Sequence, residues 1–501
     1  MAYDLPLIIT FAAYIAIVLT IAYLSTKLTS NLSDYVLAGR SLSGPVTALA
    51  AGASDMGSWL LMALPGAVYL TGIKMLWLAS GLVIGAYCNW RFVAKRIRVY
   101  TEIAGNSLTI PEFFGNRFKA PSIWLRLVVS FATIVFFTFY AAASLRAGVI
   151  LLQSIFVGID YFHALLAVAS VIVAYTILGG FLAVSWVDFF QGSLMFVALI
   201  VVPVVTCFNI GGINSALHKA SVFSVEHLEF FANSKLLTVL SMLAWGLGYF
   251  GQLHINTRFM AIRSTKELPI ARRICITWMS VALMGAVATG LFGFIFYYDA
   301  PLAEPDTVFI ELAQQLFNPW VAGVLVSAVS AAIMNTVSAQ ILMSASIIVE
   351  DFYHDLWRKH ASDKENLLAS RIILLFVAGI AVAIAATPSQ TIFKAVSFAW
   401  SGLGCAFGPT LLFSLFWRRM NYQGAIAGII SGAATVIIWE ILVHPDIALI
   451  SHPDLRSGFG MIPGFVISTL FIFVISNRTA PPSTMVLTEF DHAMAVINSK
   501  D

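Results

Sequence analysis

The stretch AAGASDMGSWLLMALPGAVYLTG, residues 50–72, places a single carboxylate, Asp55, in a run of apolar and small residues. Such a run is long enough to cross the hydrocarbon core of a bilayer as a helix, which needs about 20 residues. A charged side chain at the bilayer centre costs about 2.5–3.5 kcal/mol on insertion scales, so it normally faces an internal cavity or pathway. Asp55 therefore marks a candidate functional site within a membrane helix.

Two glycines, Gly52 and Gly57, flank Asp55. Because Gly costs about 1 kcal/mol relative to Ala inside a helix, this pair predicts an interrupted helix around residues 53–57. Backbone carbonyls freed at membrane depth must be satisfied by protein, water or an ion. A simpler interpretation is a local kink in which Asp55 caps the helix that resumes at Gly57 and Ser58, and capping and ion binding are compatible.

The whole chain has a membrane composition. Of its 501 residues, 59% are hydrophobic and 11% are charged, against about 25% charged in a soluble domain. Thirteen apolar runs predict membrane-spanning helices, near residues 5–26, 45–70, 73–93, 124–156, 162–178, 187–210, 236–256, 273–298, 319–349, 369–387, 391–417, 424–443 and 459–476. The sequence therefore predicts an all-α integral membrane protein, with a single polytopic domain over residues 1–478 and a short polar cytoplasmic tail over residues 479–501.

Basic residues are distributed unequally between the two sides of the thirteen predicted spans. One side holds 22 of the 28 Lys and Arg, and the other side holds the remaining six. Cytoplasmic loops carry the excess of Lys and Arg, so we expect the N-terminus outside and the C-terminus in the cytoplasm. No clustered soluble domain supports binding to nucleic acid.

A second interrupted helix is predicted at MLAWGLGYFGQLHINTRF, residues 242–259, which contains Gly246, Gly248 and Gly251. It lies five spans after the first, so the two interrupted helices have opposite orientations. Broken helices in corresponding positions of two inverted halves point to a binding site at the bilayer midplane. Spans 2–6 and 7–11 would then be the repeats, although chance glycines in a glycine-rich membrane protein would give the same pattern.

The ninth span contains the polar patch SAVSAAIMNTVSAQ, residues 327–340. Ala332, Asn335 and Thr336 stand at i, i+3 and i+4, so they share one helix face. Sodium prefers oxygen ligands, and an amide oxygen, a hydroxyl and freed carbonyls would replace its water shell. Close helix packing, which small and hydroxyl residues allow, explains the patch equally well.

Aromatic side chains suggest a ligand cavity near the second break. Trp245 and Tyr249 lie on one face of the seventh span, and Tyr140 lies in the fourth. Aromatic faces attract a cationic nitrogen and pack against small apolar rings. Ordinary core packing would use the same stripe.

Four motifs carry a family resemblance: ASDMGSWLLMALPGAV (53–68), GGFLAVSW (179–186), WGLGYFGQ (245–252) and RMNYQGAIAG (419–428). With YVLAGRSL near residue 35, they resemble the sodium/solute symporter family in order and separation up to about residue 478. The resemblance implies thirteen helices with the inverted five-helix repeats of leucine-transporter-type carriers. It also implies sodium as the coupling ion and a small amino acid as substrate, proline first, with other small organic solutes as the alternative.

The resemblance also implies site residues. Sodium would lie where the broken second span meets the ninth, held by the carbonyls of Ala53, Met56 and Ala332 and the side chains of Asn335 and Thr336. Residues linked to sodium or to coupling would be Asp55, Arg40 and Asp188. The substrate-binding residues would be Ser54, Gly57, Ser58, Tyr140, Trp245, Tyr249 and Gln252.

Three positions depart from the family pattern. The family usually has Ser at Asn335, Ser-Gly at Gly57 and Ser58, and Pro at Leu253. Asn still offers an oxygen, but it is bulkier and brings an amino group that cannot bind sodium. An ion channel would need a continuous polar pore, and an enzyme would need a nucleophile with a base or a metal cluster, whereas the polar residues here gather at midspan and the histidines are scattered.

Overall fold

The computed structural model describes residues 5–26, 32–120, 123–156, 158–231, 236–350, 353, 362–387, 391–443 and 460–499. These residues are predominantly helical, and the strand-like pairing among them is an isolated parallel bridge between Leu42 and Ile262. The α-helices are α1 (Leu5–Thr26), α2 (Leu32–Leu37), α3 (Gly44–Ser58), α4 (Leu64–Thr71), α5 (Leu76–Cys88), α6 (Ala94–Ile103), α7 (Ile110–Phe118), α8 (Trp124–Ile155), α9 (Tyr161–Ile210), α10 (Ile213–Phe223), α11 (Leu236–Leu243), α12 (Leu253–Ala261), α13 (Leu268–Phe296), α14 (Val308–Leu316), α15 (Pro319–Ile347), α16 (Asp363–Ala385), α17 (Ile392–Phe416), α18 (Tyr422–Val443), α20 (Met461–Arg478) and α21 (Thr484–Ser499).

Eleven helical stretches of the described chain are long and apolar enough to span a membrane, or twelve if the pair Leu236–Gly251 and Leu253–Ala261, bent by 47°, is one span. One of the eleven, Gly44–Ile103, has 60 residues. A straight helix of that size would be about 90 Å long, far more than the ~30 Å hydrocarbon core. The chain turns at Gly72 between α4 and α5, where φ is 76°. With this turn counted, the described helices match the thirteen predicted spans.

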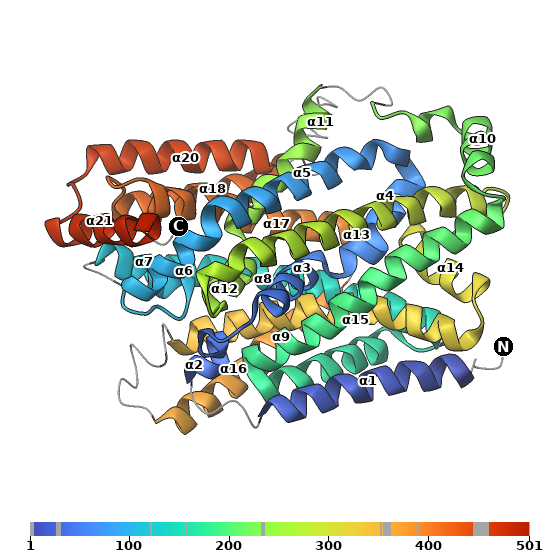
Figure 1. The fold of residues 1–501 in the computed structure, drawn as a ribbon, viewed down its shortest axis with the longest axis horizontal. Helices are drawn as coiled ribbons and strands as arrows, with labels where there is room; N and C mark the ends of the chain where they lie inside the picture. The colour runs from blue at the N-terminus through green and yellow to red at the C-terminus, as the bar shows by residue number, and fades with distance from the viewer. Residues whose placement is uncertain are drawn as a thin grey trace.

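The spans form one bundle in which the chain starts at one end and finishes at the other (Figure 1). Helix α15 is its central element, because it packs against α1, α3, α8 and α9. In an apolar 18-residue stretch of this span, 89% of the residues are buried, against 22% in the span formed by α1. Small residues along α15 let these neighbours approach closely, which is how membrane helices associate. The polar patch of residues 327–340 therefore lies inside the bundle.

Helix α9 combines the predicted fifth and sixth spans. Its backbone leaves helical geometry at Gly180, where φ is 57°, and this break separates the two apolar stretches Tyr161–Leu178 and Gly180–Ile210. The seventh span is broken as predicted, since a 3₁₀-helical segment over Ala244–Gly251 joins α11 to α12. Interrupted second and seventh spans are thus both present.

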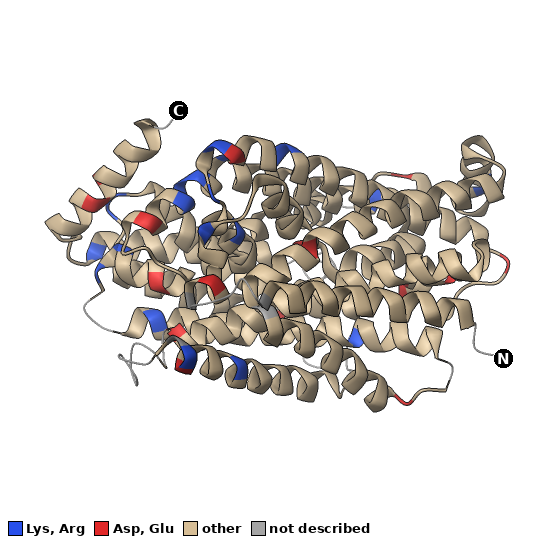
Figure 2. Cartoon of the chain, turned by 60° about the horizontal axis from the view of Figure 1, so that its bottom comes forward, with Lys and Arg blue, Asp and Glu red and all other residues tan. Residues whose placement is uncertain are grey.

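Lysine and arginine residues gather toward the end of the bundle at which the chain finishes (Figure 2). The opposite end, where α1 begins, carries few of them. Some of the basic residues used for the predicted orientation fall outside the described residues: Lys27, Lys235, Arg358, Lys359, Arg456 and Lys500. The charge asymmetry is therefore visible among the basic residues that are placed.

The predicted polar tail contains a docked helix, α21. Its residues Val486, Phe490, Ala493 and Ile497 are buried and recur at helical spacing, so one face of α21 is apolar. Glu489 pairs with Lys119 at 2.7 Å, and Asp491 binds Arg418 through two contacts of 2.8 Å. This helix was not predicted from the sequence, although the spacing of these four apolar residues indicates one.

Arg117, at the end of α7, is covered by α21. The residue is fully buried, and its guanidinium carbon lies 4.8 Å from the ring centroid of Phe490. Its Nε donates to the carbonyl of Ser414 at 3.1 Å. Helix α21 therefore holds together α7 and the connection that follows α17.

Candidate functional site

The second span breaks at Gly57. Its φ and ψ are 27° and −161°, outside helical geometry, and the chain continues through a π-helical turn over Trp59–Ala63 into α4. A Cβ added at Gly57 would lie 2.2 Å from Oγ1 of Thr336, so the backbone conformation and the close approach of α15 both require glycine. The predicted interruption is confirmed, but it is narrower than expected, since residues 53–56 stay in α3 with helical geometry.

Helices α3 and α15 meet directly at this break. The Thr336 hydroxyl donates to the carbonyl of Ser54 at 3.2 Å. Ala332, Asn335 and Thr336 are all fully buried, and so are Ala53 and Met56. The Met56 carbonyl accepts a hydrogen bond from the Trp59 N–H. The structure therefore brings the second and ninth spans into contact at Ser54, Gly57 and Thr336, beside the other residues predicted to bind sodium.

Asn335 presents an oxygen that no described residue uses. Its Nδ2 lies 3.8 Å from the sulfur of Met195 on α9, while its Oδ1 accepts no hydrogen bond within the described chain. A buried polar atom without a partner costs about 1–3 kcal/mol, so its retention calls for a reason. The amide thus offers an oxygen ligand even though this position departs from the family pattern.

Asp55 connects the two broken spans. Its Oδ2 accepts a hydrogen bond from the Tyr249 hydroxyl, and its Oδ1 accepts none from the described residues. The Tyr249 carbonyl in turn accepts from Nδ2 of Asn89 at 3.1 Å. Asp55 therefore has a protein partner on the seventh span and one unused oxygen, and among the described residues its carboxylate does not cap the helix that resumes after Gly57.

Aromatic rings surround the seventh-span break. Trp245 lies 6.3 Å from Trp59 and 6.3 Å from Trp400, measured between ring centroids, and Tyr249 packs edge-on against Trp400 at 5.2 Å. Trp400, on α17, donates from Nε1 to the Trp245 carbonyl at 3.0 Å, and its own carbonyl accepts from Gln252 at 3.3 Å. Trp59 and Trp400 were not predicted as site residues, because nothing in the sequence shows which helix a buried tryptophan faces.

The hydroxyl groups expected to bind substrate differ in availability. The Ser54 hydroxyl donates to the Ala50 carbonyl of its own helix at 2.6 Å. The hydroxyls of Ser58 and Tyr140 are buried and have no hydrogen-bond partner in the described chain. Tyr140 lies on α8. Two of these three hydroxyls are therefore free for a ligand.

Asp188 lies in a separate polar cluster. Its Oδ2 pairs with Arg258 at 2.7 Å, and both side chains are fully buried. Arg258 also donates to the Ser185 hydroxyl. Nothing in the sequence indicates that Asp188 pairs with Arg258, which lies on α12. Removing one member of a buried ion pair leaves an uncompensated charge and costs about 3–5 kcal/mol, so this pair ties α9 to α12.

Arg40 lies just before the second span, at the end of the bundle where the chain finishes. Its hydrogen bonds hold this end of the second span closed against the seventh. Its backbone has φ of 54°, and its guanidinium donates to Asn106 Oδ1 (3.2 Å), Thr101 Oγ1 (3.2 Å), the Met260 carbonyl (2.9 Å) and the Ser107 carbonyl (2.8 Å). Burial, with the nearby charge of Arg98, lowers the pKa of Arg40 to about 10, so the side chain stays protonated at neutral pH. Arg40 thus links the connection after α6 to the end of α12.

We expect Arg40→Ala to loosen this closure. Hydrogen bonds to a charged group contribute about 1.5–3 kcal/mol each, so the loss of even one predicts about a tenfold rise in local opening. The measurement is the maleimide labelling rate of a cysteine placed at the buried residue Ala261, in a variant whose native cysteines are replaced. The exposed Arg91→Ala is the matched control. Equal labelling rates in both variants would contradict a closing role for Arg40.

Comparisons with known proteins agree with this geometry. The model of the sodium:solute symporter family matches residues 35–432. The chain is 47% identical over 475 residues to the high-affinity proline transporter PutP of Bacillus subtilis, covering 94% of this chain and 98% of that one. It is 44% identical over 505 residues to the sodium/proline symporter of Escherichia coli, covering 100% and 98%.

A solved structure shows the same fold. An outward-open, substrate-bound Na⁺-coupled sialic acid symporter aligns with a TM-score of 0.80 at 18% identity, over 95% of this chain and 99% of that one. The protein thus has the leucine-transporter fold and spans the membrane many times. The chain belongs to the sodium:solute symporter family.

Proposed function

We propose that this chain carries a small amino acid, L-proline first, into the cell together with sodium by alternating access. One observation carries the choice of substrate: the full-length identity to proteins named as proline carriers. Another small organic solute is the alternative, because the family as a whole is defined by sodium and not by one solute. In this proposal the chain catalyses no covalent step.

Sodium would bind between α3 and α15. The proposed ligands are the carbonyls of Ala53, Met56 and Ala332 with the side chains of Asn335 and Thr336. The contact between Thr336 and Ser54 and the unused Oδ1 of Asn335 support this set, because they put buried oxygen atoms on both helices at the break. Broken helices in transporters coordinate sodium with carbonyls of this kind.

The substrate would bind beside the ion, between the two breaks. Tyr140, Trp245, Tyr249 and Gln252 would contact it, together with the segment Ser54–Ser58. Aromatic faces would attract the cationic nitrogen of an amino acid, and the helix that resumes after Gly57 has a positive end that suits a carboxylate. The free hydroxyls of Ser58 and Tyr140 support this placement.

Coupling in this proposal needs only that each ligand binds better when the other is present. A reciprocal coupling free energy of about 1–3 kcal/mol is typical. Asp55 is suited to transmit it, because its carboxylate joins the helix at the sodium site to Tyr249 at the substrate site. Arg40 would have to release its four partners before the inner end opens, and Asp188 would lie along the exit of sodium.

We place the N-terminus outside and the C-terminus in the cytoplasm, in a bacterial plasma (inner) membrane. The gathering of Lys and Arg at the end where the chain finishes supports this orientation (Figure 2). The short connections after Arg40 and Arg258 would then face the cytoplasm.

The direct test is uptake of radiolabelled L-proline into vesicles that contain the purified protein. We expect accumulation with an inward sodium gradient and little uptake when the gradient is dissipated by a sodium ionophore. Competition by unlabelled amino acids and other solutes tests the substrate. Uptake that is independent of both sodium and its gradient would contradict coupled symport. Unitary conductance steps in a planar bilayer would indicate a channel instead.

A further inference from the structure

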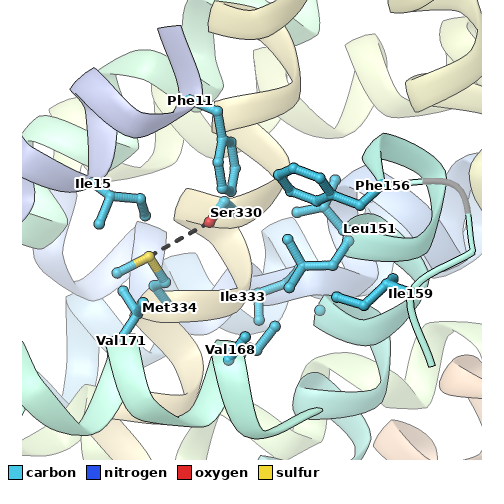
Figure 3. Close-up of a pocket in the computed structure, with 13 residues that line it drawn as sticks. Phe11, Ile15, Leu151, Phe156, Ile159, Val168, Val171, Ser330, Ile333 and Met334 are labelled. Atoms are coloured by element: carbon cyan, nitrogen blue, oxygen red, sulfur yellow. Dashed lines mark hydrogen bonds between the residues drawn. The ribbon is translucent and has the colours of Figure 1, made fainter. Parts of the chain in front are cut away.

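An apolar cavity of about 280 Å³ lies between α1, α8, α9 and α15, and its lining residues are distinct from those of the site described above (Figure 3). Phe11, Leu151, Val171 and Ile333 represent its four walls. Ser330 has the one hydroxyl among the residues that line it, and this hydroxyl contacts the sulfur of Met334 at 3.5 Å. Apolar cavities of about 150 Å³ already stay dry and bind hydrocarbons, so a cavity of this size suits an apolar occupant.

The mouth of the cavity opens onto the lipid-facing surface. Ala167 is exposed, and Phe11 and Val168 at the rim are half-buried. On the same helices, the neighbouring Ile9 and Leu166 are 46% and 42% exposed and point outward from the bundle. Hydrophobic side chains exposed on membrane spans face lipid tails, so hydrocarbon is the medium at the mouth. The occupant that reaches this cavity most directly is an acyl chain.

A fixed negative charge lies at the membrane-surface end of the cavity. Phe156 and Ile159, in the connection from α8 to α9, line that end, and Asp160 follows Ile159. The Asp160 carboxylate caps α9, accepting from the Phe162 N–H at 3.0 Å and pairing with His163 Nδ1 at 3.1 Å. The hydrogen bond to His163 lowers the pKa of Asp160, which therefore stays negatively charged at neutral pH. A cationic headgroup complements this end.

We propose that the cavity holds one acyl chain of a phospholipid with a primary ammonium headgroup, such as phosphatidylethanolamine. The chain lies between α1 and α9 with its end against Ile333, and the ammonium group lies at Asp160. The apolar lining, the lipid-facing mouth and the exposed carboxylate each match one part of this lipid.

The occupant would support α15 at a sensitive turn. Met334 on the cavity floor contacts the Tyr14 hydroxyl through its sulfur at 3.6 Å, and its carbonyl accepts from the Tyr175 hydroxyl at 2.8 Å. The next two residues, Asn335 and Thr336, are proposed sodium ligands. This consequence for sodium binding rests on the proposed function, whereas the lipid site itself does not.

The test is photolabelling of the full-length protein in vesicles by phosphatidylethanolamine that carries a diazirine near the end of one acyl chain. We expect adducts concentrated on the cavity residues, Ile333 and Leu151 above all. Val171→Trp, which fills the cavity, is expected to reduce these adducts about tenfold, equivalent to 1.4 kcal/mol. Leu166→Trp, on the lipid-facing side of the same helix, is the matched control and should leave them unchanged. Val171→Phe repeats the test if the tryptophan variant does not fold.

A separate experiment tests the headgroup assignment. The same diazirine on phosphatidylcholine should label the cavity less than phosphatidylethanolamine, and Asp160→Asn should remove that difference. Adducts spread evenly over lipid-facing residues such as Leu166, or equal labelling of wild type and both Val171 variants, would overturn the site. Equal labelling by the two lipids would overturn the role of Asp160. Labelling requires no transport, so its failure is distinct from failure of the proposed symport.

Discussion

Replacing Asp55 by Ala is expected to abolish sodium-driven uptake. The change removes the Asp55 carboxylate from the contact between the two broken spans and leaves the Tyr249 hydroxyl with the weaker acceptor Met279 Sδ at 3.7 Å. A hydrogen bond to a charged group is worth about 1.5–3 kcal/mol, which corresponds to a loss of about 10- to 100-fold in transport efficiency for this bond alone. The measurement is the initial rate of labelled proline uptake as a function of sodium concentration.

Two matched variants separate the charge of Asp55 from its hydrogen bond. Asp55→Asn keeps an oxygen that accepts from Tyr249 but removes the charge, whereas Tyr249→Phe removes the hydrogen bond and keeps the charge. We expect the asparagine variant to lose sodium dependence and the phenylalanine variant to retain it at a lower rate. Asp299→Ala, at an exposed position, is the control for expression and insertion. Undiminished coupled uptake by Asp55→Ala would show that the charge is not required.

Gly57→Ala should have the second largest effect. A left-handed φ of 27° strains any side chain, at about 1–3 kcal/mol, and the new Cβ would lie 2.2 Å from Thr336 Oγ1. Thr336 must therefore move away from Ser54, which separates the proposed sodium ligands of α3 and α15. We expect the sodium concentration for half-maximal uptake to rise more than about tenfold, as a loss of 1.4 kcal/mol or more predicts.

Gly379→Ala provides the control for this substitution. Gly379 lies on α16, and a Cβ there meets no atom within 4 Å. The melting temperature and the sodium dependence of the Gly379→Ala variant should match those of wild type. If Gly57→Ala also matched wild type in both measurements, the close approach of α15 to the break would not be required for function.

Much of the fold follows from the sequence, because hydropathy and glycine placement are local signals. The thirteen spans and the two interrupted helices could be predicted in this way, and Gly57 lies inside the predicted break. The narrower extent of the break could not be predicted, since residues 53–56 keep their helical geometry through packing against α15. The local sequence indicates where a helix is easily interrupted, whereas packing against neighbouring helices determines how many residues leave helical geometry.

Contacts between distant helices were the part that local pattern could not supply. The family resemblance, and not spacing, predicted that the second span meets the ninth, whereas the particular contact of Thr336 with Ser54 came from the structure. Trp400 and Arg258 were missed, because their partners Trp245 and Asp188 lie more than one helix away along the chain. A buried tryptophan or arginine needs a partner, but only the packed bundle identifies that partner.

The docking of α21 has a consequence for how the protein is made. Translation runs from the N-terminus, so α21 leaves the ribosome after α7, α17 and α18 have been synthesised. Until then Lys119 and Arg418 lack the carboxylates of Glu489 and Asp491, and the Arg117 guanidinium lacks the covering ring of Phe490. A nascent chain released before α21 is made would therefore expose this basic surface, which the finished chain covers.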